Sequence, residues 1–102
     1  MNRLDAVILQ QARLQIMASL AALPPGEQLD FVHLRTILEL TNGNLGAHLA
    51  KLEAAGYVRT EKTFVARRPR TYIALTDAGR DVFHAHVEAL KEIIKAAAGG
   101  AS

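Results

Sequence analysis

The chain has 102 residues and a formal net charge of +2, with half of its residues hydrophobic and 22% charged, which is the length and composition of one globular domain. Cys is absent, so disulfides, thiolate metal sites and cysteine nucleophiles are excluded. The apolar runs are far shorter than the roughly 20 residues of a membrane span and no signal-peptide core is present, so we expect a cytoplasmic protein without membrane contact.

The first apolar residues are spaced for one face of a helix, at Leu4, Val7 and Ile8. Their phase does not continue into the next apolar set, so residues 2–11 are expected to form a separate N-terminal arm. From residue 12 onward, apolar residues cover about half of a helical circumference until Pro24, Pro25 and Gly26 end the helix. This arc is wide for a helix that covers one small core.

Two short polar signals predict the starts of the next helices. Asp30 follows a very short strand expected at Leu29, and its carboxylate can cap a second helix. Thr41 can cap a third helix a few residues after the second one closes near Leu40. Two helices this close in sequence must turn sharply against each other, as in a helix-turn-helix.

The third helix has the clearest pattern in the chain, with Leu45, Leu49 and Leu52 on one face and Gly56 as a left-handed cap. The residues that follow, 57–65 and 71–75, are rich in β-branched and aromatic residues. They predict a two-stranded hairpin with its tip at residues 66–70.

A last helix is expected over residues 77–98, capped by Thr76. Its apolar residues step by four, three and four, which is the spacing of a coiled-coil seam. Together with the N-terminal arm, this seam exceeds what one small core can absorb, so a homodimer is predicted. The expected dimer residues are Leu4, Val7, Ile8, Phe83, Val87, Leu90 and Ile94.

The charge of the chain is unevenly distributed. Residues 51–70 contain six basic and two acidic residues and so carry +4, while the rest of the chain carries −2. A local basic patch is the electrostatic footprint of a nucleic-acid binder, although a solvated hairpin tip has the same composition.

The element order defines an α+β, mostly helical fold, a winged helix-turn-helix with a two-stranded β wing and terminal dimerisation helices. Two blocks of sequence carry a family resemblance: N-L-x-x-H-L-x-x-L-E-x-x-G-Y-V at residues 44–58 and R-R-P-R-T at residues 67–71. With them, roughly residues 12–95 resemble the small standalone winged-helix transcriptional regulators related to the MarR and ArsR families. The domain would comprise the arm at 2–11, a winged-helix core at 12–76 and the C-terminal helix.

The resemblance implies a regulator, more often a repressor, that binds double-stranded DNA as a homodimer at a pseudo-palindromic operator. It leaves open a small-molecule effector, of which the residues give no sign. It places Thr41, Asn42, Asn44, His48 and Lys51 on the recognition helix, residues 41–55, and Lys62, Arg67, Arg68, Arg70 and Thr71 on the wing.

The residues support the same assignment independently. A helix in the roughly 12 Å major groove needs small or polar side chains, and Asn44 and His48 offer donors and acceptors. Ala47 can touch a thymine methyl, and Gly43 permits close approach to phosphate. The arginines around Pro69 suit the negative potential of a narrow minor groove or of phosphates.

Three alternative functions have to be weighed against DNA binding. A winged helix can bind another protein instead of DNA, although protein interface cores are depleted of charge. Asp81, His84 and Glu88 share one helical face and could hold a metal, but solvation explains them better, and we expect no metal and no cofactor. The serines, Ser19 and Ser102, lack the surroundings of a nucleophile, so an enzyme is not expected.

Overall fold

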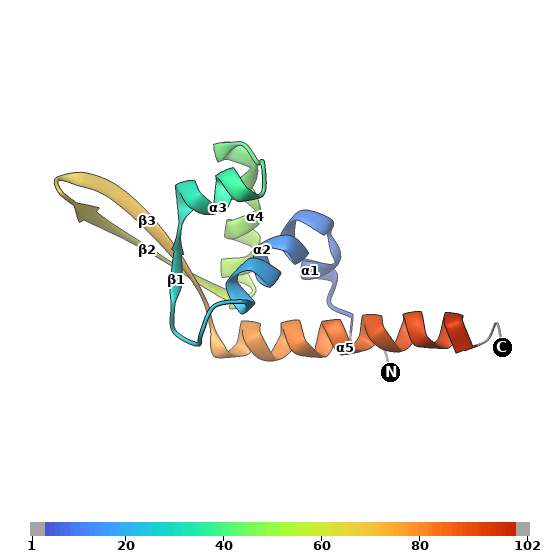
Figure 1. Ribbon diagram of the computed structural model, residues 1–102. Helices are drawn as coiled ribbons and strands as arrows, with labels where there is room; N and C mark the ends of the chain where they lie inside the picture. Colours follow the sequence, from blue (N-terminus) through green and yellow to red (C-terminus); the bar gives the residue numbers. More distant parts are fainter. Residues whose placement is uncertain (1–3, 100–102) are drawn as a thin grey trace.

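The computed structural model describes residues 4–99 and confirms the predicted α+β winged-helix fold, in which helices predominate (Figure 1). In chain order the elements are α1 (Ala6–Leu9), α2 (Gln11–Ala21), β1 (Gln28–Asp30), α3 (Phe31–Ile37), α4 (Asn42–Ala54), β2 (Val58–Val65), β3 (Arg68–Leu75) and α5 (Asp77–Gly99). Residues 2 and 3 of the expected N-terminal arm lie outside the described residues. The rest of that arm comprises helix α1, the residues that flank it and the first residue of α2.

The polar caps predicted from the sequence are present. The Asp30 carboxylate accepts a hydrogen bond from the His33 N–H at 3.2 Å and starts α3. The Thr41 hydroxyl accepts one from the Asn44 N–H at 3.0 Å and starts α4. After α4, Gly56 has a φ of +82°, the left-handed conformation that favours glycine. Helices α3 and α4 therefore form the predicted helix-turn-helix.

The sheet has three antiparallel strands in the order β1-β3-β2. Strand β2 pairs with β3 along its whole length, from Val58 opposite Leu75 to Val65 opposite Arg68. Strand β1 pairs only with residues 72–74 of β3. The outer half of the β2–β3 hairpin therefore extends beyond β1 as a two-stranded wing (Figure 1).

The wing tip is shorter than the sequence predicted. The turn consists of Ala66 and Arg67 alone, with φ values of 50° and 66°. The expected tip at 66–70 was wrong because both strands continue further, with Pro69 in β3 opposite Phe64. Pro69 is tolerated there because β1 does not reach it, so no strand on that side requires the backbone N–H donor that proline lacks.

One core joins the first four helices to the sheet. Its fully or nearly buried side chains are Ile8, Ile16, Met17, Leu20, Leu34, Leu45, Leu49, Leu52, Val58, Ile73 and Leu75. Ile8 was expected on a dimer surface, and this assignment was wrong because the side chain is fully buried within its own chain. Helix α1 is thus part of the domain and not a free arm.

The molecule is elongated, with extents of 60 × 25 × 22 Å. Its radius of gyration is 15.4 Å, larger than the roughly 13 Å of a compact domain of 100 residues. Two projections cause the difference: the wing lies at one end, and the C-terminal half of α5 runs past the body at the other (Figure 1). Residues 91–99 are all exposed.

Candidate nucleic-acid interface

Helix α4 turns its leucines into the core and presents small or polar side chains to solvent. Leu45, Leu49 and Leu52 are buried. The exposed positions of the helix from its start are Asn42, Gly43, Asn44, Ala47, Ala50, Lys51, Glu53 and Ala54. His48 is half-buried beside them. The exposed face therefore has little bulk, as a helix that enters a groove requires.

Two glycines of α4 have no packing role. A Cβ built at Gly43 or at Gly46 would meet no heavy atom within 4 Å. Glycine within a helix costs about 1 kcal/mol relative to alanine. Since the fold itself does not require either glycine, their place on this face fits a surface that a partner approaches closely.

The start of α4 is joined to α3 by a side-chain hydrogen bond. The Arg35 guanidinium donates to the amide oxygen of Asn42 at 2.7 Å. Asn42, expected to contact DNA, thus uses its acceptor within the chain. Arg35 joins the surface as a basic residue that sequence reasoning missed, because no local pattern links residues seven apart on two different helices.

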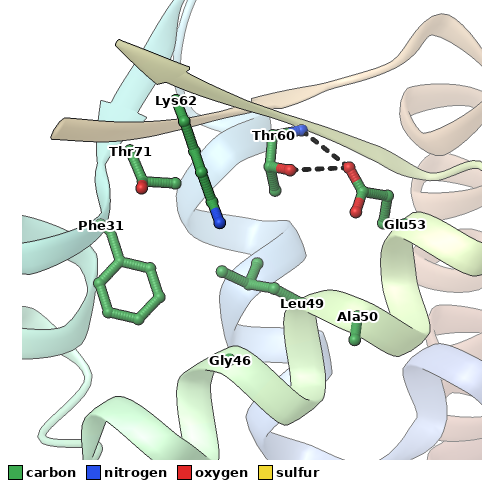
Figure 2. Close-up of a pocket in the computed structure, with 8 residues that line it drawn as sticks. All are labelled: Phe31, Gly46, Leu49, Ala50, Glu53, Thr60, Lys62 and Thr71. Carbon is green, nitrogen blue, oxygen red and sulfur yellow. Dashed lines mark hydrogen bonds between the residues drawn. The ribbon is translucent and has the colours of Figure 1, made fainter. Parts of the chain in front are cut away.

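Glu53 connects α4 to the base of the wing. Its Oε2 atom accepts hydrogen bonds from both the Thr60 N–H, at 3.2 Å, and the Thr60 hydroxyl, at 2.7 Å (Figure 2). These bonds fix the inclination of the hairpin to the helix, since Glu53 lies in the last turns of α4 and Thr60 near the start of β2.

A hollow of about 320 Å³ separates α4 from the inner face of the wing. Its lining residues are Phe31, Gly46, Leu49, Ala50, Glu53, Thr60, Lys62 and Thr71. Lys62 extends from β2 across this space toward α4 (Figure 2). The structure thus brings the predicted wing residues Lys62 and Thr71 next to the predicted recognition helix.

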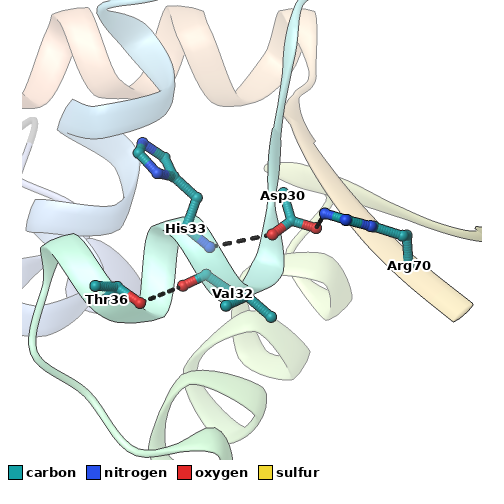
Figure 3. A network of polar contacts seen from close by, with 5 residues as sticks. All are labelled: Asp30, Val32, His33, Thr36 and Arg70. Atoms are coloured by element: carbon teal, nitrogen blue, oxygen red, sulfur yellow. Dashed lines mark hydrogen bonds and ion pairs between the residues drawn. The ribbon is translucent and has the colours of Figure 1, made fainter. Parts of the chain in front are cut away.

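The three wing arginines differ in their surroundings. Arg70 lies 3.6 Å from the Asp30 carboxylate, which also caps α3 (Figure 3). This contact partly neutralises Arg70 and ties the wing to the helix-turn-helix. Arg67 and Arg68 are exposed, and among residues 4–99 neither has an ion-pair partner. Their full charge is available at the wing tip.

The expected dimer residues do not form one continuous surface. Leu4 is half-buried. Val7 and Phe83 are partly buried against the chain's own core, and Ile8 is fully buried in it. Val87 and Leu90 are half-buried on α5, and Ile94 is 67% exposed. Ile93, which the sequence reading did not single out, is 52% exposed next to it. Of the expected dimer residues, Ile94 alone is exposed, on the projecting end of α5.

A buried polar network joins three distant segments. The Tyr57 hydroxyl donates to the Asp5 carboxylate at 2.5 Å, and the Asp5 N–H donates to Nδ1 of the fully buried His86 at 3.1 Å. The hydrogen bond to Asp5, together with burial, raises the pKa of Tyr57 to about 12. Burial lowers the pKa of His86, and the nearby Asp5 charge opposes this only in part. The network anchors the start of α1 to α5.

Other site types find no support among the described residues. Within residues 4–99 no three His, Asp or Glu side chains are grouped so that they could hold a metal ion, and Asp81, His84 and Glu88 are no exception. None of the helices in this range has both the length and the apolar character of a membrane span.

A helix-turn-helix followed by a basic hairpin defines a winged-helix protein, and the comparisons identify its family. Residues 12–94 match the model of the winged helix DNA-binding domain, so the chain belongs to this family. It is 37% identical over 83 residues to the uncharacterized protein MJ0432 of Methanocaldococcus jannaschii, which is 81% of this chain and 87% of that protein.

Solved structures agree with the family assignment. A transcriptional regulator homologue from Pyrococcus horikoshii has a TM-score of 0.80 and 33% identity, with 88% of this chain and 86% of that chain covered. The structure of the MepR–DNA complex of S. aureus shares the fold, with a TM-score of 0.74, 18% identity and coverage of 97% and 78%.

Proposed function

We propose that this protein is a sequence-specific transcriptional regulator that binds double-stranded DNA. One observation carries the proposal: the exposed, low-bulk face of α4 lies beside a wing whose tip carries the unpaired cations Arg67 and Arg68. Such a helix fits the major groove, and the arginines fit phosphates or an adjacent minor groove. The Pyrococcus regulator homologue and the DNA-bound S. aureus structure support this function.

The two parts of the surface have separate tasks in this proposal. Asn44 and His48 form hydrogen bonds to base edges, and Ala47 contacts thymine methyl groups. Gly43, which has no side chain, lets the helix backbone come close to a phosphate. The phosphate contacts come from Thr41, Lys51, Lys62, Thr71 and the wing arginines. We add Arg35 to them, because its guanidinium lies at the start of α4. Sequence discrimination then depends on α4, while the wing supplies most of the salt-sensitive affinity.

The proposed functional unit is a homodimer held by the C-terminal half of α5. A helical segment this short is marginal alone in water, and the side chains of residues 91–99 are all exposed. Pairing through Leu90, Ile93 and Ile94 would bury this segment of α5.

The dimer determines the form of the operator. A two-fold dimer presents two α4 helices about 34 Å apart, so the operator is a pseudo-palindrome. Repression follows because the dimer occupies promoter DNA.

Titration of fluorescent duplexes tests the function. The protein is added to its own upstream DNA and to a scrambled duplex at several salt concentrations. Tighter binding to the upstream DNA is expected, with a log–log salt slope of roughly −4 to −8 for about four to eight neutralised phosphates. Failure to bind either duplex at about 50 mM salt would contradict the proposal and indicate a protein-contact module, because phosphate contacts are strongest at low salt.

A double variant tests the wing within the same assay. Arg67→Ala with Arg68→Ala removes two cations from each protomer, so binding should weaken on both duplexes and the slope should flatten by about two to four. Arg59→Ala is the control, because Arg59 is exposed on β2 near the base of the hairpin, away from the tip. An unchanged slope in the double variant would remove the wing from the interface.

A further inference from the structure

The wing carries an apolar side chain that the core does not use. Phe64 is 74% exposed, more than any other large hydrophobic side chain among the described residues. It lies one residue from the end of β2, far from the buried part of the sheet. Nothing among residues 4–99 covers this aromatic ring, so its partner is expected outside the chain.

Strand register places Phe64 on the inner face of the wing. It is paired with Pro69, which is also exposed, and directly opposite residues of an antiparallel pair share a face. Residues two apart on a strand share that face too, so Phe64 and Pro69 are aligned with Lys62 and Thr71. Those two residues line the hollow beside α4. The apolar pair therefore faces whatever α4 engages.

Cations surround this apolar pair. Arg67 occupies the turn and Arg68 follows it, both without ion-pair partners in the described part of the chain, and Lys62 lies on the same face as Phe64. A protein interface core is depleted of charge, which makes a protein partner a poor fit. A second copy held by α5 is also a poor fit, because the wing lies at the opposite end of the molecule (Figure 1).

An exposed apolar pair with cations on either side is complementary to the minor groove of duplex DNA. The groove offers phosphates for the cations, and apolar side chains such as Phe and Pro can be inserted there between base steps and unstack them. Resting on the proposed function, we propose that Phe64, backed by Pro69, is a wedge that opens a base step in the minor groove beside each half-site. The protein would thereby bend its DNA.

A wedge would give the protein a preference for flanking DNA sequences that arginines alone would not give. Arginines in a minor groove favour stiff A-tracts, because the narrow groove has an enhanced negative potential. A wedge favours flexible pyrimidine–purine steps such as TA, which unstack easily. The two modes therefore rank the same flanking sequences in opposite order.

The test uses duplexes that differ only in the flank contacted by the wing. This flank is first located as the DNA whose protection from cleavage is lost in the Arg67→Ala, Arg68→Ala variant. Matched duplexes then carry either a TA step or an A-tract there, with 2-aminopurine at the step to report unstacking. The wild-type protein is compared with Phe64→Ala and with Val65→Ala, which removes the neighbouring exposed side chain from the other face.

With a wedge, the wild type and Val65→Ala prefer the TA flank and raise the 2-aminopurine emission. Phe64→Ala should bind the TA duplex roughly 5- to 30-fold more weakly, in line with the loss of one aromatic contact to bases, and leave the emission unchanged. Circular dichroism should show unchanged folding, since the ring is exposed.

Two other results would overturn the wedge, and they can be told apart. If the wild type and Phe64→Ala bind equally and share a preference for the A-tract without emission change, the wedge is wrong while DNA binding stands. If the wild-type protein binds none of the duplexes at any salt concentration, the proposed function fails as well.

Discussion

Two glycines on α4 allow the stability of the fold and its affinity for DNA to be tested separately. Gly43 and Gly46 weaken the helix, and the surrounding structure leaves room for a methyl group at both positions. Gly43→Ala and Gly46→Ala should therefore each raise the free energy of unfolding by about 0.5–1 kcal/mol, measured by urea denaturation. If DNA approaches the backbone closely, the same variants should bind the upstream duplex about 10-fold more weakly. Greater stability with unchanged affinity would show that the glycines have no role in binding.

His86 makes stability depend on pH. Burial lowers its pKa from 6.5, so the folded chain disfavours the charged imidazole that the unfolded chain accepts. The unfolded state then binds more protons below about pH 6.5, and the free energy of unfolding falls as the pH decreases below that value. Protonation at Nδ1 would also oppose the hydrogen bond from the Asp5 N–H.

Denaturation at pH 7.5 and pH 5.5 tests this role. His86→Asn keeps an acceptor near the Nδ1 position but does not titrate, so the difference in stability between the two pH values should shrink. His84→Asn, two residues away on the exposed side of α5, is the control and should keep the difference of the wild type. An unchanged difference in His86→Asn would mean that other groups cause the pH dependence.

At the scale of elements, the sequence predicts what local chemistry determines. The helix starts at Asp30 and Thr41, and the end of α4 at Gly56, each depend on one side chain or one φ angle within a few residues. The pairing of β1 with β3 joins residues more than 40 apart, and a three-residue strand has too little pattern to predict it.

Parts of the candidate site were unpredictable for the same reason. A two-residue turn with both φ angles positive normally carries Asn-Gly, and Ala66–Arg67 gives no such signal. The Arg35–Asn42 and Glu53–Thr60 contacts join different elements, so they appear only once the fold is known. The basic residues, in contrast, could be found from composition alone.

The hydrogen bonds between Glu53 and Thr60 fix the orientation of the wing relative to α4, and substitutions of Glu53 test this role. Glu53→Ala removes a negative charge, which alone should strengthen DNA binding, but it also frees the hairpin, so binding should weaken several-fold. Glu53→Gln also loses the charge but keeps an oxygen acceptor for Thr60, and should bind at least as tightly as the wild type. Equal gains in both variants, measured by fluorescence titration, would show that this contact does not orient the wing.

At the scale of the whole molecule, the proposed homodimer depends on the projecting end of α5. Ile94→Asp places a charge on the proposed seam at a side chain that is 67% exposed, so the monomer fold should be unaffected while the dimer dissociates. Lys95→Asp alters the charge of the adjacent exposed residue off the seam and should leave the dimer intact. Light scattering measures the mass directly. A dimeric Ile94→Asp protein would place the interface elsewhere.

The central claim is that two copies of α4 enter the major groove and two wings contact the flanking DNA. Hydroxyl-radical footprinting of the upstream duplex measures this arrangement most directly. Two symmetric protected regions centred about 10 base pairs apart are expected, each with an outer segment that disappears in the Arg67→Ala, Arg68→Ala variant. A single protected region, or uniform protection along the DNA, would contradict the claim.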